Sequence, residues 1–154
     1  MKILLPKAVS AVWRRELKQA GQREIGGVLL GEALGGDEFR VLEASLQRDG
    51  GSPARFVRDP EHHGKAIRDF HERTGHDYRR FNYLGEWHSH PSFPTRPSQD
   101  DVCAMREILA DGRVGATFAC LLILRHRPFR RLDIGASVFT PDGGISPVLV
   151  KRER

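Results

Sequence analysis

Apolar residues recur every three or four positions in several segments of the chain, and this spacing predicts helices. The segments PKAVSAVWRRELKQAG and DPEHHGKAIRDFHERTG predict helices over residues 6–21 and 59–75. Asp59 followed by Pro60 is typical of a helix start, and Gly21 is typical of a helix end. The segment SQDDVCAMREILADG predicts a third helix over residues 98–112.

Short apolar runs bounded by Gly, Pro and Asp predict strands between these helices. The runs EIGGVLLGE and EFRVLEASL flank a glycine-rich turn and predict a hairpin over residues 24–46. FNYLGEWHSHP predicts a strand at residues 81–91 that runs into the loop SFPTRPSQ, which is rich in Pro and Ser. Further strands are predicted at residues 54–58, 114–124, 130–139 and 145–150.

This mixed order predicts one α/β domain over residues 1–154, with a mixed or mostly antiparallel sheet flanked by helices. A chain of 154 residues can bury a substantial core without disulfides. The N-terminal run MKILLPKAV is short and contains Pro6, so no signal peptide is expected. The longest apolar run, residues 116–124, is about half of what a membrane helix needs, so no membrane partner is expected.

Composition agrees with a soluble protein, since 39% of the residues are hydrophobic and 29% are charged. Cys103 and Cys120 lie in apolar surroundings and lack the spacing of a structural zinc site, so both are expected in the core. Two such cysteines form no disulfide framework, which favours a reducing, cytoplasmic location.

The net charge of +5 comes mainly from arginine, which is concentrated in RHRPFRR (residues 125–131) and in the terminal KRER. Three interpretations remain open: a solvated surface, a site for an acidic protein partner, or a site for nucleic acid. Nucleic acid is not favoured, because the chain has no known nucleic-acid motif and no aromatic residues at stacking intervals.

The segment HSHPSFPTRPSQDD carries the candidate chemistry. His88 and His90 lie two residues apart, and side chains at this spacing point to the same side of an extended backbone. The loop that follows is long enough to bring Asp101 back to them. Two histidines and a carboxylate, with one position left for water, are typical of a catalytic zinc site.

Each part of this pattern also has a structural explanation. A single His-x-His pair is weak evidence, because the chain contains five other histidines. Ser98 and Asp101, before an apolar run, resemble a helix capping box. The two interpretations are compatible, since a side chain at a helix start can also face a metal.

Neighbouring residues leave further alternatives open. Glu86 could orient a histidine or form a structural salt bridge, and Trp87 is expected in the core because it points away from the histidines. Pro91 is expected to fix the turn that leaves the site. Gly26 and Gly27 could admit a substrate backbone or allow close strand packing.

The combination of HSHP, six residues, Ser98, two residues and Asp101 resembles the signature of the JAMM (JAB1/MPN/Mov34) zinc metallopeptidases. GEWHSHP is similar to the prokaryotic JAB branch of that family, and EIGGVLLG matches its upstream glutamate before a small apolar stretch. The resemblance spans roughly residues 5–140 and implies the cytidine-deaminase-like α/β fold of the family.

The resemblance assigns roles residue by residue. His88, His90 and Asp101 match the ligands of one Zn²⁺ per chain. Ser98 matches the residue that stabilises the oxyanion, and Glu24 matches the general base that activates water. Nothing in the residue pattern singles out Glu24, so its role depends on the resemblance.

The activity implied by the resemblance is hydrolysis of peptide or isopeptide bonds after the C-terminal tail of a ubiquitin-like protein. The tail is expected to add to a sheet edge beside the zinc. The expected partners are ubiquitin-like proteins, their conjugates, and ubiquitin-like activating and conjugating enzymes, some of which act in antiphage defence. The alternatives are processing of a sulfur-carrier protein, a non-catalytic scaffold and a nucleic-acid-associated relative. The chain lacks the extra Cys/His cluster of some eukaryotic members, so linkage-specific deubiquitination is not implied.

Overall fold

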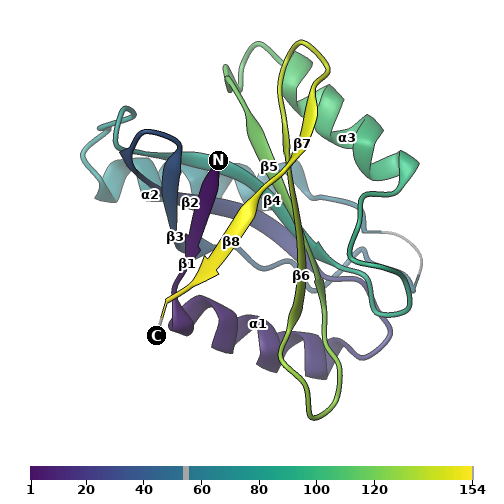
Figure 1. Cartoon of the computed structure of the whole chain (residues 1–154). Coiled ribbons are helices and arrows are strands. Elements are labelled where there is room, and N and C mark those ends of the chain that lie inside the picture. The colour runs from purple at the N-terminus through teal and green to yellow at the C-terminus, as the bar shows by residue number, and fades with distance from the viewer. Residues whose placement is uncertain (54–55, 154) are drawn as a thin grey trace.

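The computed structural model describes residues 1–53 and 56–153 of the chain. Strands and helices alternate in a mixed order through the described part (Figure 1). In chain order the elements are β1 (Lys2–Leu5), α1 (Lys7–Ala20), β2 (Gly26–Gly35), β3 (Glu38–Ala44), α2 (Pro60–Arg73), β4 (Phe81–Ser89), α3 (Gln99–Ala110), β5 (Ala119–Arg125), β6 (Asp133–Phe139), β7 (Ile145–Pro147) and β8 (Leu149–Arg152).

The strands form one mixed sheet in the order β7-β6-β5-β4-β2-β3-β1-β8. β1 is parallel to both of its neighbours and β4 is parallel to β5, whereas the remaining pairs are antiparallel. The two edge strands, β7 and β8, are consecutive in the chain, and the amide of Val148 between them donates to Ala136 of β6. The sheet therefore curves back towards itself, as the course of β8 in Figure 1 shows.

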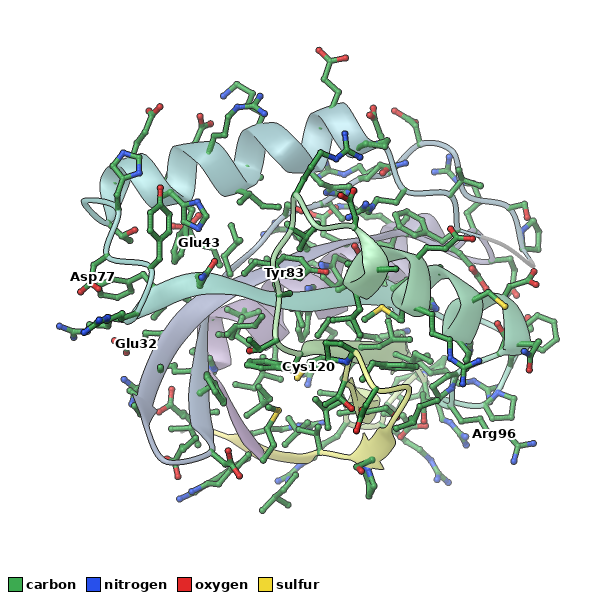
Figure 2. All side chains as sticks on the ribbon, turned by 90° about the horizontal axis from the view of Figure 1, so that it is seen from above. Glu32, Glu43, Asp77, Tyr83, Arg96 and Cys120 are labelled. Atoms are coloured by element: carbon green, nitrogen blue, oxygen red, sulfur yellow. The ribbon has the colours of Figure 1, made fainter. Side chains whose placement is uncertain are left out.

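Helices cover both faces of this sheet. On one face, Trp13 and Leu17 of α1 are buried in the main core. On the other face, Phe70 of α2 packs with β2, and Met105 of α3 packs with β5. In Figure 2, Tyr83 and Cys120 lie inside the molecule, between these layers. Both faces of β5 are consequently buried, which explains its apolar run.

The three predicted helices are confirmed with small changes at their ends. Gly21 ends α1 at φ 63°, a left-handed conformation that favours glycine. Asp59 caps α2 by accepting the amides of Glu61 and His62, and Pro60 occupies the first turn. Ser98 and Asp101 form the predicted capping box of α3.

Several predicted strands differ from the structure. β1 was not predicted, residues 114–118 precede β5 as a loop, and the last predicted strand is divided at Val148 into β7 and β8. Of the strand predicted at 54–58, the described residues contain only an isolated bridge between Gly51 and Phe56; residues 54–55 lie outside the described part. The prediction that both cysteines are in the core is wrong for Cys103, which is exposed on α3, whereas Cys120 is buried.

The paired glycines at the start of β2 are explained by close strand packing. A Cβ atom on Gly27 would lie 2.0 Å from the carbonyl oxygen of Ser45. A Cβ atom on Gly26 would lie 2.5 Å from the carbonyl oxygen of Trp87. Real Cβ atoms do not approach backbone this closely, so the packing of the protein's own strands requires both glycines.

Candidate metal centre

The C-terminal end of β4 delivers two histidines to one side of the sheet. His88 and His90 are both buried, and their Nε2 atoms lie 3.1 Å apart. Trp87 and Ser89 point to the opposite side, as the strand alternation requires. There the Trp87 ring lies 5.2 Å from that of Trp13 in the core, and Ser89 Oγ accepts the amide of Ile25.

Asp101 reaches the same point from the first turn of α3. Its Oδ1 lies 3.2 Å from His88 Nε2, and its Oδ2 lies 3.5 Å from His90 Nε2. The same carboxylate accepts the amide of Ser98 at 2.7 Å, which fixes the side chain at the helix start. The histidines hold the pKa of Asp101 well below its usual range, which more than offsets the opposing effect of burial.

The three ligand atoms have the spacing that a tetrahedral metal requires. All of them lie within 4.8 Å of one another: the two Nε2 atoms are 3.1 Å apart, Asp101 Oδ1 lies 3.2 Å from His88 Nε2, and Asp101 Oδ2 lies 3.5 Å from His90 Nε2. With zinc–ligand bonds of about 2.0–2.1 Å, two corners of a tetrahedron lie about 3.3 Å apart. These separations are close to that value, so the residues present fit a zinc ion.

A backbone contact also sets the protonation of His90 for metal binding. His90 Nδ1 lies 2.9 Å from the carbonyl oxygen of Pro94, and a carbonyl can only accept. Nδ1 consequently carries the proton, and the Nε2 lone pair faces His88 and Asp101. A histidine that donates its other ring nitrogen to a carbonyl is a recurrent arrangement at metal sites.

Glu24 lies immediately before β2 and is buried beside this cluster. The backbones of Ile25 and Ser89 hold its segment against the end of β4, because the Ser89 amide donates to the Ile25 carbonyl at 2.9 Å. Burial raises the pKa of the Glu24 carboxyl, and the nearby His88 and His90 partly offset that rise. The pKa of this carboxyl is therefore set by burial and by the two histidines. Carboxyl groups with such perturbed pKa values are candidates for a catalytic base.

A cavity of about 330 Å³ brings four of the five predicted site residues together: Glu24, His90, Ser98 and Asp101. Ser98 Oγ accepts the Asp101 amide at 3.2 Å, and its own hydroxyl proton has no acceptor among residues 1–53 and 56–153. That proton is therefore free to be donated into the cavity. Arg96, which Figure 2 shows at the surface, extends from the loop on the rim.

A second cavity of about 370 Å³ adjoins the cluster and is lined by the fifth residue, His88. At its wall, Glu86 forms an ion pair with Arg58 at 2.6 Å, and Tyr83 donates to the same carboxylate oxygen. The salt-bridge interpretation of Glu86 is thus the one that the geometry supports. Phe56 and Asp101 line both cavities, so the metal cluster lies between them.

Two neighbours of the cluster were not recognised from the sequence. Phe56 stacks near His88, with ring centroids 6.3 Å apart and an interplanar angle of 17°. Arg58 follows in the same loop. Neither belongs to a local motif, and only the folded loop brings them to the site.

The structure contradicts the expected sheet edge beside the site. β4, which carries the histidines, pairs with β2 on one side and β5 on the other. The edges of the described sheet are β7 and β8, and neither carries a candidate site residue.

Residues 6–134 match the family described as prokaryotic homologs of the JAB domain. The chain belongs to this family. This confirms the recognition of the JAB branch from the motif around His88 and His90, and it covers the elements from α1 into β6. No match is found among functionally curated proteins.

Solved structures agree with this assignment. The solution structure of protein DSY2949 from Desulfitobacterium hafniense has a TM-score of 0.67 and 26% sequence identity, covering 98% of this chain and 94% of that one. The crystal structure of AF2198, a JAB1/MPN domain protein from Archaeoglobus fulgidus, has a TM-score of 0.50 and 15% identity, covering 97% and 98%. The JAB1/MPN α/β fold, with a mixed sheet flanked by helices, is confirmed. Among the described residues, no helix is both long and apolar enough to cross a membrane.

Proposed function

We propose that this JAB-domain protein is a zinc-dependent peptidase or isopeptidase. The observation that carries the proposal is the convergence of His88, His90 and Asp101 at tetrahedral spacing beside a buried glutamate. Two imidazoles and one carboxylate are a ligand set of catalytic zinc sites, which keep one position open for water or substrate. Structural zinc sites instead fill all four positions with protein ligands.

In the proposed reaction, zinc, Glu24 and Ser98 have separate roles. Zinc at such a site lowers the pKa of a bound water to about 7 and polarises a carbonyl. Glu24 takes one proton from the attacking water and delivers it to the leaving nitrogen, so that a carboxylic acid and an amine result. Ser98 donates a hydrogen bond from its free hydroxyl to the oxyanion that develops on the carbonyl oxygen and keeps its proton.

The proposed substrate is a ubiquitin-like protein or its conjugate, cleaved after the C-terminal tail. The metal cluster lies between two cavities, which gives one binding region to each side of a scissile bond. Both cavities are small, so a narrow, extended tail suits them better than a folded chain. Processing of a sulfur-carrier protein would use the same geometry with a different leaving group.

The proposal can be tested by measuring zinc per chain in the purified protein and in Asp101→Ala. Glu61→Ala is the matched control, because Glu61 lies in the first turn of α2, is exposed and lines neither cavity. We expect about one zinc in the wild type and in the control, and its loss in Asp101→Ala. Cleavage of a ubiquitin-like fusion should follow the zinc content. A folded wild type that takes up no zinc after reconstitution would refute the proposal.

A further inference from the structure

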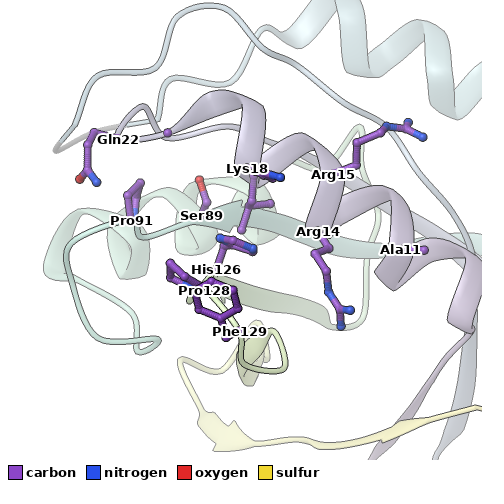
Figure 3. A pocket seen from close by; sticks show the side chains of 12 residues that line it. Ala11, Arg14, Arg15, Lys18, Gln22, Ser89, Pro91, His126, Pro128 and Phe129 are labelled. Carbon is purple, nitrogen blue, oxygen red and sulfur yellow. The ribbon is translucent and has the colours of Figure 1, made fainter.

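A further cavity lies on the other side of the metal-carrying strand. It has a volume of about 840 Å³ and is formed between α1 and the segment that follows β5 (Figure 3). Ser89 and Pro91, on either side of His90 in the sequence, contribute to its wall. A volume of this size lies within the usual range of small-molecule sites, which is about 300–1,000 Å³.

The lining of this cavity is strongly basic. Arg14, Arg15, Lys18 and His126 line it, and none of its lining residues is acidic. Arg15 is paired with Glu16 at 3.0 Å. Arg14 and Lys18, in contrast, form no ion pair with any residue that the structure describes. Figure 3 shows their side chains projecting from α1 beside His126. The cavity therefore presents positive charge that the described residues leave uncompensated.

More positive charge continues beyond one end of the cavity. Burial lowers the pKa of Arg152, and the charges of Arg131 and Arg14 lower it further, so these three guanidinium groups lie near one another. Arg152 is held in place by a hydrogen bond to the carbonyl of Leu132. Asp133 partly offsets these charges, but it is already paired with Arg127 at 2.7 Å, so the three guanidinium groups keep a net positive charge that an anionic ligand would neutralise.

An aromatic ring completes the cavity. Phe129 lines it and is fully exposed, with a backbone φ of 59°. A bulky residue at positive φ is an outlier, and such outliers gather at functional sites. Figure 3 shows Phe129 and Pro128 next to His126. An exposed ring beside arginine and lysine suits a planar base attached to phosphates.

The wall of this cavity has few backbone groups that could bind a peptide. Pro91 and Pro128 have no backbone N–H, and the backbone of α1 is bonded within the helix. The cavity also has no free strand edge to which an acidic peptide could add as a strand. The large exposed apolar side chains Val12 and Leu42, which a protein partner could bury, belong to a different cavity.

We propose that this basic cavity is a nucleotide-binding site, with phosphates on Arg14 and Lys18 and the base on Phe129. The proposal is independent of peptide hydrolysis, because the cavity lies on the opposite side of β4 from the metal cluster. The ligand could be a free nucleotide or one unit of a nucleic-acid strand, since the two share phosphate and base.

Binding of Mg·ATP to the purified protein tests the proposal, measured by isothermal titration calorimetry. Two charge-assisted contacts are lost in the double variant Arg14→Glu/Lys18→Glu, so affinity should fall about 100-fold. Phe129→Ala should weaken ATP about 10-fold but leave pyrophosphate unchanged, because only the base stacks. The matched control, Arg68→Glu/Arg106→Glu, makes the same charge change on exposed positions of α2 and α3 and should change affinity less than about twofold.

A short oligothymidylate, followed by fluorescence anisotropy, distinguishes the two sources of the ligand. Tighter binding of the oligomer than of Mg·ATP, with the same dependence on Arg14 and Phe129, assigns the site to nucleic acid. Tighter binding of Mg·ATP assigns it to free nucleotide. The proposal is overturned if neither binds, if the control variant loses as much affinity as the double variant, or if poly-glutamate binds more tightly than both.

Discussion

Ser98 and Asp101 hold each other at the start of α3, with the Ser98 amide 2.7 Å from Asp101 Oδ2 and the Asp101 amide 3.2 Å from Ser98 Oγ. Asp101 therefore caps the helix with the same carboxylate that faces His88 and His90. The helix start and the metal cluster are one structural unit. Removing either residue is expected to affect both stability and chemistry.

Substitution Ser98→Ala is expected to lower turnover by about 10²–10³, the usual effect of losing one oxyanion donor. It should also reduce the free energy of unfolding by about 1 kcal/mol, because the amide of Asp101 loses its acceptor. Steady-state kinetics and urea unfolding measure the two effects.

Two further variants separate these effects. Ser98→Thr keeps both hydroxyl and cap and should retain most activity, whereas Ser98→Asp keeps a good cap but has no proton to donate. Full activity in Ser98→Asp would leave Ser98 with a capping role only.

Substitution Glu24→Gln is expected to lower turnover by about 10²–10⁴, because a buried amide cannot carry a proton from water to the leaving nitrogen. Zinc content should remain at the wild-type level, since Glu24 is not among the three clustered ligands. Mass spectrometry of bound metal and single-turnover cleavage measure the two quantities. Glu72→Gln, an exposed change on α2, serves as the control. Loss of zinc in Glu24→Gln would assign Glu24 to the metal instead of the proton.

His63 is expected to make stability depend on pH. Its ring is buried, with Nδ1 2.8 Å from Ser45 Oγ and Nε2 2.9 Å from Gln47 Oε1. Burial, followed by the charges of His62 and Arg58, lowers the pKa of His63 from 6.5 to about 4. Between these two values the unfolded chain binds the proton and the folded protein does not. His63 therefore contributes up to about 3 kcal/mol above pH 6.5, and this contribution falls as pH decreases towards 4.

Urea unfolding of the wild type and His63→Gln at several values between pH 4 and pH 7 tests this dependence. The glutamine can keep both hydrogen bonds but does not titrate. The difference in unfolding free energy between the two proteins should therefore shift in favour of the variant as pH falls. A constant difference across this range would show that the His63 pKa is not lowered.

Substitution Gly27→Ala is expected to destabilise the protein by about 3 kcal/mol, because the new methyl group would lie 2.0 Å from the Ser45 carbonyl oxygen. Gly112→Ala is the control, since a Cβ atom there meets nothing within 4 Å and the position has no positive φ. Thermal unfolding compares the two. Equal melting temperatures would show that β2 and the Ser45 segment separate easily.

The helices and most strands could be predicted because their signals are local. Asp59, Pro60 and Ser98 mark helix starts, and apolar runs mark β2 and β5. β1 could not be predicted in this way, because it has four residues and pairs in parallel with β3 and with β8, which is distant in the chain. β1 forms a strand because of its pairing with residues far away in the sequence, and a pattern of neighbouring residues does not reveal such pairing.

The candidate site was predictable to the extent that its residues are close in sequence. His88, His90, Ser98 and Asp101 share one segment, and the structure brings them to one place. Glu24 depended on the family resemblance, because a single glutamate before a strand carries no signal of its own. The exposure of Cys103 was not predicted, because the residues next to it in the sequence are apolar. In the helix, however, Cys103 lies on a face that is polar and exposed.

The position of β8 has a consequence for synthesis on the ribosome. β1 is made first, yet its second neighbour in the sheet is made only after β7, because Lys2 pairs with Leu149. A nascent chain can assemble β1 with β3 early, but β1 then has an open edge until residues 149–152 emerge. Open edges invite pairing with other chains. A chaperone that covers this edge until residues 149–152 have emerged would therefore favour the native pairing.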